Sequence, residues 1–130
     1  MTRREIRECA FIILYEHSLR DDALEDLYEL AEEIEGVEVN DEVKKIVCGV
    51  IEHDEELSTI VSKYSTKRAL PRIPRVTLSI LKIAVYEALY DDKTPVNAAI
   101  SEAVQLSDAF SYKEDTAFVN GVLSSFAKEL

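Results

Sequence analysis

The segment from Arg75 to Tyr90 constrains the fold more than any other part of this 130-residue chain, because it is apolar almost all the way round a helix. A helix without a polar face must be enclosed by other helices. With only three Gly and three Pro, the chain also has few turn residues for a fold of many short strands. We therefore predict an all-α bundle in which residues 75–90 form the central, buried helix. Its apolar positions are Val76, Leu78, Ile80, Leu81, Ile83, Ala84, Val85, Ala88 and Leu89.

Helical periodicity covers nearly the whole sequence and predicts about seven helices. Gly36 is expected to end the second helix, and Asn40 is a good N-cap for the third. Thr94 is expected to cap the sixth helix, and Ser111 to open the last one with a capping box. The helices before the central one are expected at about residues 3–17, 23–34, 40–53 and 54–64.

The chain is long enough for a single domain, and we expect one over residues 1–130. The connector, residues 65–74, contains two prolines and several basic side chains. It is therefore expected to divide the domain into an N-terminal helical half, residues 1–64, and a C-terminal helical half, residues 65–130.

The net charge of −11 is distributed unevenly. Residues 1–62 hold 18 acidic and 6 basic side chains, whereas residues 63–130 hold 8 acidic and 9 basic ones. Local potential decides where a polyanion docks, so residues 57–86, which contain no acid, are compatible with an RNA surface. Taken by itself, this stretch is better explained as a solvated loop rim. The basic residues of this stretch are Lys63, Lys67, Arg68, Arg72, Arg75 and Lys82.

Several functional classes find no support in the sequence. No apolar run is long enough to span a bilayer and no signal-peptide pattern is present, so we expect a cytoplasmic protein. Cys9 and Cys48 lie at apolar helical positions without CxxC spacing and are expected to be buried free thiols. Because catalytic motifs, phosphate-binding loops and metal-ligand spacings are missing, we predict no enzymatic activity, no cofactor and no metal.

Three arginines open the first predicted helix, where the helix dipole disfavours cations. An external anion would offset this cost, and an RNA phosphate backbone is a natural one for Arg3, Arg4 and Arg7. The alternative is pairing within the helix, for example between Arg4 and Glu8. If the arginines serve RNA, replacing them with Ala should leave the melting temperature unchanged or slightly raised.

The last predicted helix contains Asn120 and Gly121 in its interior. Gly costs about 1 kcal/mol there relative to Ala, so another group is expected to approach the backbone closely at this point. That group is either a neighbouring helix or a ligand. Phe118, two residues earlier, is either a core side chain or an exposed ring that stacks on an unpaired base.

Taken together, several blocks resemble the NusB family of transcription antitermination factors. Residues 118–123 match the family string FVNGVL outright, and residues 80–87 follow its ILRxAxYE core. Residues 95–106 match its P…VAINEAVELA block. The resemblance covers nearly the full length, and the 118–123 block is its most specific part. The arginines of the first helix followed by Ala10 and Leu14-Tyr15, then Gly49-Val50 and Arg72-Ile73, also fit the family pattern.

The resemblance implies an all-α fold of two small helical subdomains and a non-enzymatic RNA-binding factor. Its implied partners are a NusE-type ribosomal protein and a short single-stranded boxA element in nascent, commonly ribosomal, transcripts. The complex would help RNA polymerase read through terminators. The sequence leaves open whether the protein also forms a homodimer.

The same resemblance assigns roles to individual positions. It places Thr77 and Lys82 near the protein partner, and it places a set of residues from the first and last helices at or near the RNA: Arg3, Arg4, Arg7, Glu114, Phe118 and Asn120. From the basic stretch itself we also expect Arg72, Arg75 and Lys82 to contact RNA phosphates.

At several positions the chain departs from the family pattern, and these departures sustain a rival interpretation. That rival is a protein–protein adaptor of the same fold with weakened or lost RNA binding, favoured by the acidic first half and by Asp108. A methyltransferase's helical RNA-binding domain is a further rival, although no cofactor-binding segment is present in residues 1–130. The departures are Arg68 for Trp, Thr77 for an acid, Lys82 for Arg, Ser101 for Asn, and Asp108 for Lys or Arg.

Overall fold

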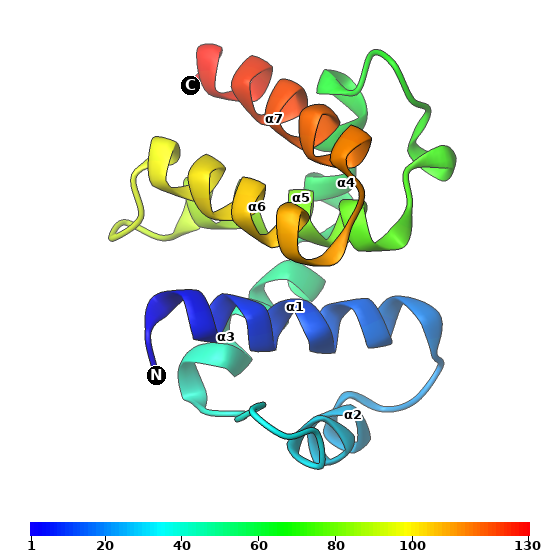
Figure 1. Ribbon diagram of the computed structural model, residues 1–130, viewed down its shortest axis with the longest axis vertical. Coiled ribbons are helices and arrows are strands. Elements are labelled where there is room, and N and C mark those ends of the chain that lie inside the picture. Colours follow the sequence, from blue (N-terminus) through cyan, green and yellow to red (C-terminus); the bar gives the residue numbers. More distant parts are fainter.

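A computed structural model of the chain describes all 130 residues as seven α-helices and one short 3-10 helix, without any strand (Figure 1). This confirms the predicted all-α class. None of the helices combines the length and apolar character that crossing a membrane requires. The elements are α1 Arg3–Leu19, α2 Leu24–Glu32, α3 Asp41–Glu52, α4 Asp54–Tyr64, η1 Leu70–Arg72, α5 Arg75–Tyr90, α6 Val96–Phe110 and α7 Lys113–Lys128.

The helices form two groups, one above the other in Figure 1. The N-terminal group consists of α1, α2 and α3, and the C-terminal group of α4, α5, α6 and α7. Helix α5 joins the groups, because α1 and α3 pack against it from one side and α4, α6 and α7 from the other. The division at residues 64 and 65 stays a prediction: α4 belongs to the first half of the sequence but packs with α5 and α7. The chain passes between the groups once, at His53.

Helix α5 is the central element that its sequence predicts. Its middle residues, such as Ile80 and Leu81, are fully buried, and so are polar residues at both ends, including Thr77 and Glu87. Its exposed residues lie at its two ends, at Arg75 in the first turn and at Tyr90 in the last. The enclosure of α5 on nearly every side fixes the position of both helical groups around one continuous core.

Of the three predicted side-chain caps, only that of α3 is confirmed. Asn40 caps α3 by accepting a 2.9 Å hydrogen bond from the backbone N–H of Val43. The caps predicted for α6 and α7 are wrong. The Thr94 hydroxyl instead contacts Asp91 and Arg3, each at 2.6 Å, and the Ser111 hydroxyl donates to the Ser107 carbonyl at 2.8 Å.

Close approach to a glycine occurs at Gly49, not at Gly121. A Cβ atom on Gly49 would lie 2.3 Å from the ring of Tyr86, so α3 and α5 need a glycine there. Gly121 is exposed, and nothing lies within 4 Å of the position a Cβ would take. Close packing of a neighbouring helix therefore does not explain the glycine at position 121. Of the two explanations considered, an external ligand remains.

Three smaller expectations also need correction. Helix α2 ends at Glu32 rather than beside Gly36, which sits in the following turn with a positive φ of 86°. The second helix was expected to reach residue 34, but Ile34 lies beyond its end and is exposed. Cys9 is buried as expected, but Cys48 is exposed on α3, with its sulfur 3.4 Å from the Tyr28 hydroxyl.

Candidate nucleic-acid interface

Arg7 lies inside the protein, contrary to the expectation that it faces RNA. Its Nε donates to both carboxylate oxygens of Glu87 on α5, at 2.8 and 2.9 Å. Its Nη1 also lies 4.0 Å from Glu102 on α6. Burial disfavours the charged guanidinium, but the hydrogen bonds and charge of Glu87 outweigh burial and raise the pKa of Arg7. The anion that offsets the helix dipole is therefore supplied by the protein itself.

Arg3 and Arg4 are half-exposed and are paired across helices. Arg3 donates to Asp91 at 2.9 Å and to the Thr94 hydroxyl at 2.6 Å. Arg4 lies 3.3 Å from Glu102, so its suggested pairing with Glu8 is wrong. An arginine has five N–H donors, and these contacts leave several of them at the surface. Both side chains can therefore hold a phosphate without abandoning their carboxylates.

The carboxylate of Asp91 stays ionised in this polar cluster. Burial alone would raise its pKa. Hydrogen bonds from the Thr94 hydroxyl and the Lys93 backbone N–H, together with the charge of Arg3, hold the pKa of Asp91 below its usual value. The start of α1 is thus a region of closely balanced charges rather than an unshielded cationic patch.

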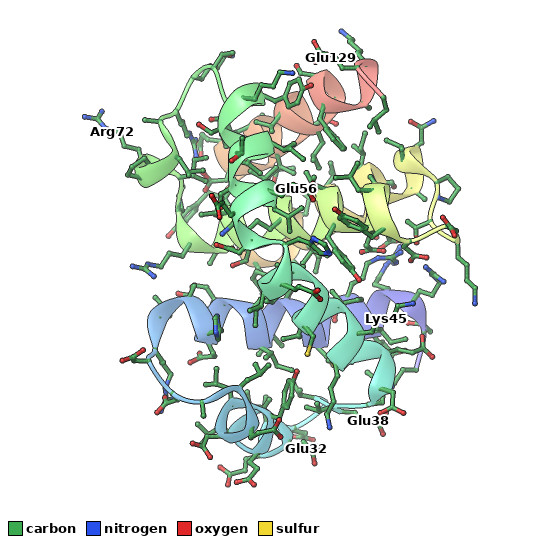
Figure 2. All side chains as sticks on the ribbon, turned by 180° about the vertical axis from the view of Figure 1, so that it is seen from behind. Glu32, Glu38, Lys45, Glu56, Arg72 and Glu129 are labelled. Atoms are coloured by element: carbon green, nitrogen blue, oxygen red, sulfur yellow. The ribbon has the colours of Figure 1, made fainter.

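Two cations of the connector have no carboxylate partner. Lys67 and Arg72 are exposed and make no ion pair, and Figure 2 shows Arg72 pointing away from the body of the molecule. Arg75 is exposed and donates to the Ser18 carbonyl at the end of α1. These side chains are free to contact a polyanion because no internal anion competes for them.

Phe118 is half-buried, so it is neither a full core residue nor a free ring. The Arg68 guanidinium lies over the ring at 4.4 Å from its centroid and donates to Asp115 at 2.7 Å. The arginine that replaces the family's Trp thus covers part of the ring. Glu114 and Asn120 are exposed on the same helix.

The two residues expected to contact a protein partner differ in accessibility. Thr77 is fully buried and its hydroxyl has no hydrogen-bond partner, so its assignment as a contact residue is wrong. Lys82 remains accessible in a cleft of about 400 Å³ between the ends of α1 and α3 and the side of α5. Its ammonium lies 2.6 Å from Asp54. Lys82 is therefore the one of the pair that can meet a partner.

The predicted RNA residues do not converge on one point. Figure 1 places the start of α1 and the connector on opposite sides of the molecule, with the junction of α6 and α7 over the middle of α1. Two aromatic residues that our sequence analysis missed are exposed at this junction. Phe110 packs 4.9 Å from Phe11 between ring centroids, and Tyr112 is 78% exposed. The usable sequence signal was two rings set among small and polar residues at a helix junction.

The fold and this surface define a class: an all-helical protein whose outer face combines basic side chains with exposed aromatic rings. Nowhere do three or more His, Cys, Asp or Glu side chains gather as metal ligands would. The sequence model of the NusB family matches residues 4–128. The chain belongs to the NusB family, which confirms the resemblance drawn from its motifs.

Individual relatives agree over the full length. The transcription antitermination protein NusB of Lysinibacillus sphaericus is 36% identical over 129 residues, covering 99% of this chain and 99% of that protein. Its counterpart in Bacillus subtilis is 35% identical over 130 residues, covering 100% and 98%.

Solved structures show the same agreement. NusB of T. maritima aligns with a TM-score of 0.85 and 28% identity, covering 99% of this chain and 92% of that one. A chain from the crystal structure of antitermination factors NusB and NusE in complex with double-stranded RNA also aligns with a TM-score of 0.85. Its identity is 26%, over 98% of this chain and 97% of that chain.

Proposed function

We propose that this chain is a transcription antitermination factor. It binds boxA-type single-stranded RNA in nascent, commonly ribosomal, transcripts together with a NusE-type ribosomal protein, and it promotes read-through by RNA polymerase. The observation that carries the proposal is the full-length similarity to proteins named for antitermination. The likeness to a NusB chain solved with NusE and RNA adds to it. A cytoplasmic location and a non-enzymatic mode of action are part of the proposal.

The RNA surface runs from the start of α1, past the junction of α6 and α7, to the connector. Arg3 and Arg4 at one end and Arg72 and Arg75 at the other supply phosphate contacts, which fix the position of the strand. Bases of the single strand stack on exposed rings, of which Tyr112 is the most accessible. Glu114, Phe118 and Asn120 then contact RNA from the first turns of α7.

Arg7 does not contact RNA itself but holds other residues of this surface in position. Its bond to Glu87 fixes the start of α1 against α5, and that placement sets where Arg3 and Arg4 reach solvent. Lys82 serves the protein partner from its cleft, beside the ends of α1 and α3. The two proposed surfaces meet at the end of α1, because Arg75 donates to the carbonyl of Ser18, which also lines this cleft.

The internal pairing of the α1 arginines favours RNA binding that depends on the protein partner. Each of these arginines has a carboxylate within 3.3 Å, which weakens its attraction for a phosphate. The same observation supports the rival adaptor, which would bind the partner protein but no RNA.

Fluorescence anisotropy on a labelled boxA-type RNA distinguishes the antitermination factor from the adaptor. The binding is measured with and without the NusE-type protein, at two salt concentrations. We expect salt-sensitive binding that tightens with the partner, with a log–log slope of about −0.7 per phosphate contact. The paired variant Lys67→Ala/Arg72→Ala should reduce that slope. Lys128→Ala, which removes an exposed charge at the other end of α7, should not. Partner binding without any RNA signal would establish the adaptor instead.

A further inference from the structure

A mostly apolar groove of about 190 Å³ lies between α1 and α2, outside the surfaces assigned above. It is formed where a ridge of α1 faces the apolar stripe of α2 and the turn that follows it. The volume is smaller than that of a typical small-molecule pocket, so the groove fits one or two side chains of a peptide. Its lining residues are Ile12, Ile13, Glu16, Arg20, Leu27, Leu30, Ala31 and Ile34.

The apolar stripe of α2 continues beyond what the protein itself covers. Leu27 and Ala31 are buried against α1, but Leu30 and Ile34 are 40% and 46% exposed. Helix α2 packs chiefly against α1, so no other element shields these two side chains. Adjacent exposed apolar residues with a polar rim are typical of protein–protein contact sites.

The rim of the groove is strongly acidic. Residues 21–42 contain 11 acids and no base, and among them only Asp22 has an ion-pair partner, Arg20 at 2.5 Å. Asp26 and Glu33 stand four residues before and three residues after Leu30, and therefore share its face. Glu16 lines the opposite side of the groove. Figure 2 shows Glu32 and Glu38 at the same end of the molecule.

We infer that this groove docks a basic amphipathic segment of another protein. Apolar side chains of that segment would enter between Leu30 and Ile34, and flanking Lys or Arg residues would pair with Glu16, Asp26 and Glu33. Such a partner neutralises carboxylates that otherwise repel one another. RNA is excluded from this face because its phosphates carry the same sign of charge.

A second copy of the chain is a poor occupant for the groove. The only strongly basic segment of this protein is the connector, and its larger apolar residues are turned inward. Ile73 is buried and Leu70 is half-buried. The connector therefore offers charges without apolar anchors, whereas the groove calls for both.

The probe for this proposal is a synthetic amphipathic Leu/Lys helix of about 14 residues, roughly the shortest that is helical in water. A peptide with Glu in place of every Lys serves as its control. Calorimetry should show saturable binding of the basic peptide and none of the acidic one. In methyl NMR spectra, the signals of Ile12 and Ile34 should shift during the same titration, which locates the peptide in the groove.

Two paired variants test the apolar and the charged parts separately. Leu30→Ser/Ile34→Ser should weaken binding by about tenfold or more, because both anchors are lost. Asp26→Asn/Glu33→Gln should weaken it less and reduce its dependence on salt. The control pair Glu52→Gln/Glu55→Gln removes two exposed charges from the junction of α3 and α4 and should change affinity by less than about twofold.

Several outcomes would overturn the inference. Unchanged peptide affinity in the Leu30/Ile34 variant would mean that the basic peptide is attracted to the acidic protein in general. Equal losses of affinity in the Asp26/Glu33 variant and the Glu52/Glu55 control would mean the same. Self-association that disappears in the Leu30/Ile34 variant would make a second copy the occupant. Because neither side chain belongs to the buried core, the variants should fold normally, which circular dichroism checks. Binding of boxA-type RNA should be unaffected, so failure here leaves the proposed function standing.

Discussion

Arg7 and Glu87 lie 80 positions apart in the sequence, yet the Nε of Arg7 donates to both carboxylate oxygens of Glu87, at 2.8 and 2.9 Å. Their side chains are only 7% and 4% exposed. The pair joins α1 to α5 and so connects the two helical groups. A residue that resembles an RNA contact by its position in the sequence is therefore part of the protein's interior.

Replacing Arg7 with Ala should lower the free energy of unfolding by about 3–5 kcal/mol, because Glu87 would remain buried without its partner. Urea denaturation measures this directly. The half-exposed Arg4→Ala should cost no more than about 1 kcal/mol. The double variant Arg7→Met/Glu87→Met should recover most of the loss, since no charge is then buried. An Arg7→Ala variant as stable as Arg4→Ala would contradict a structural role.

Two glycine substitutions should change stability in opposite directions. Gly49→Ala should destabilise the protein by about 1–3 kcal/mol, because the new Cβ would overlap the ring of Tyr86. Gly121→Ala should stabilise it by about 1 kcal/mol, since Ala is the better helix former and nothing is near. Thermal unfolding compares the two. A loss of RNA affinity in the more stable Gly121→Ala variant would identify the ligand as the group that needs this glycine.

Asp91 should make the free energy of unfolding depend on pH in the acidic range. Its pKa is lower in the folded state than in the unfolded chain, where it is about 3.9. The resulting stabilisation is fully present above the unfolded value and is lost as the pH falls through the folded one. Asp91→Asn should therefore be less stable than the wild type at pH 7, with the difference shrinking below about pH 4. Asp92→Asn, at the exposed neighbouring residue, is the matched control and should change the free energy of unfolding by less than about 0.5 kcal/mol.

Substitutions of two rings should separate RNA stacking from packing. Tyr112→Ala should lower RNA affinity by about 1–3 kcal/mol and leave unfolding within about 0.5 kcal/mol of the wild type. Phe118→Ala should lower RNA affinity and also destabilise the fold, because the ring is half-buried beneath Arg68. Anisotropy and thermal melting measure both quantities on the same samples. Normal RNA binding by both variants would remove the rings from the proposed surface.

The helices could be predicted from the sequence because a 3.6-residue period is a local property. Residues 75–90 were expected as the central helix, and α5 has those bounds. The capping signals that failed were those whose hydroxyl has another partner in the folded chain. Thr94 has the features of an N-cap, but Asp91 and Arg3 take its hydroxyl, and only the folded chain brings Arg3 there.

The candidate site was less predictable for the same reason. Whether an arginine meets a phosphate or a carboxylate depends on which helix lies opposite, and no local pattern links Arg7 to Glu87. Gly49 and Gly121 both lie within helices, and only the position of Tyr86 distinguishes them. The basic connector was easier to identify, because the absence of nearby acids is visible in the sequence itself.

The ion pairs that tie the N-terminal group to the C-terminal group all originate from Arg3, Arg4 and Arg7. The other links between the groups are the single chain crossing at His53, the packing of α1 and α3 against α5, and the hydrogen bond from Arg75 to the Ser18 carbonyl. Trimming the first two turns of α1, or fusing a bulky tag there, would therefore remove every ion pair between the groups as well as the arginines themselves. Loss of RNA binding after such a change would report altered architecture as much as missing contacts. Single substitutions at Arg3 and Arg4, with Arg7 intact, are the ones whose effects can be assigned to RNA.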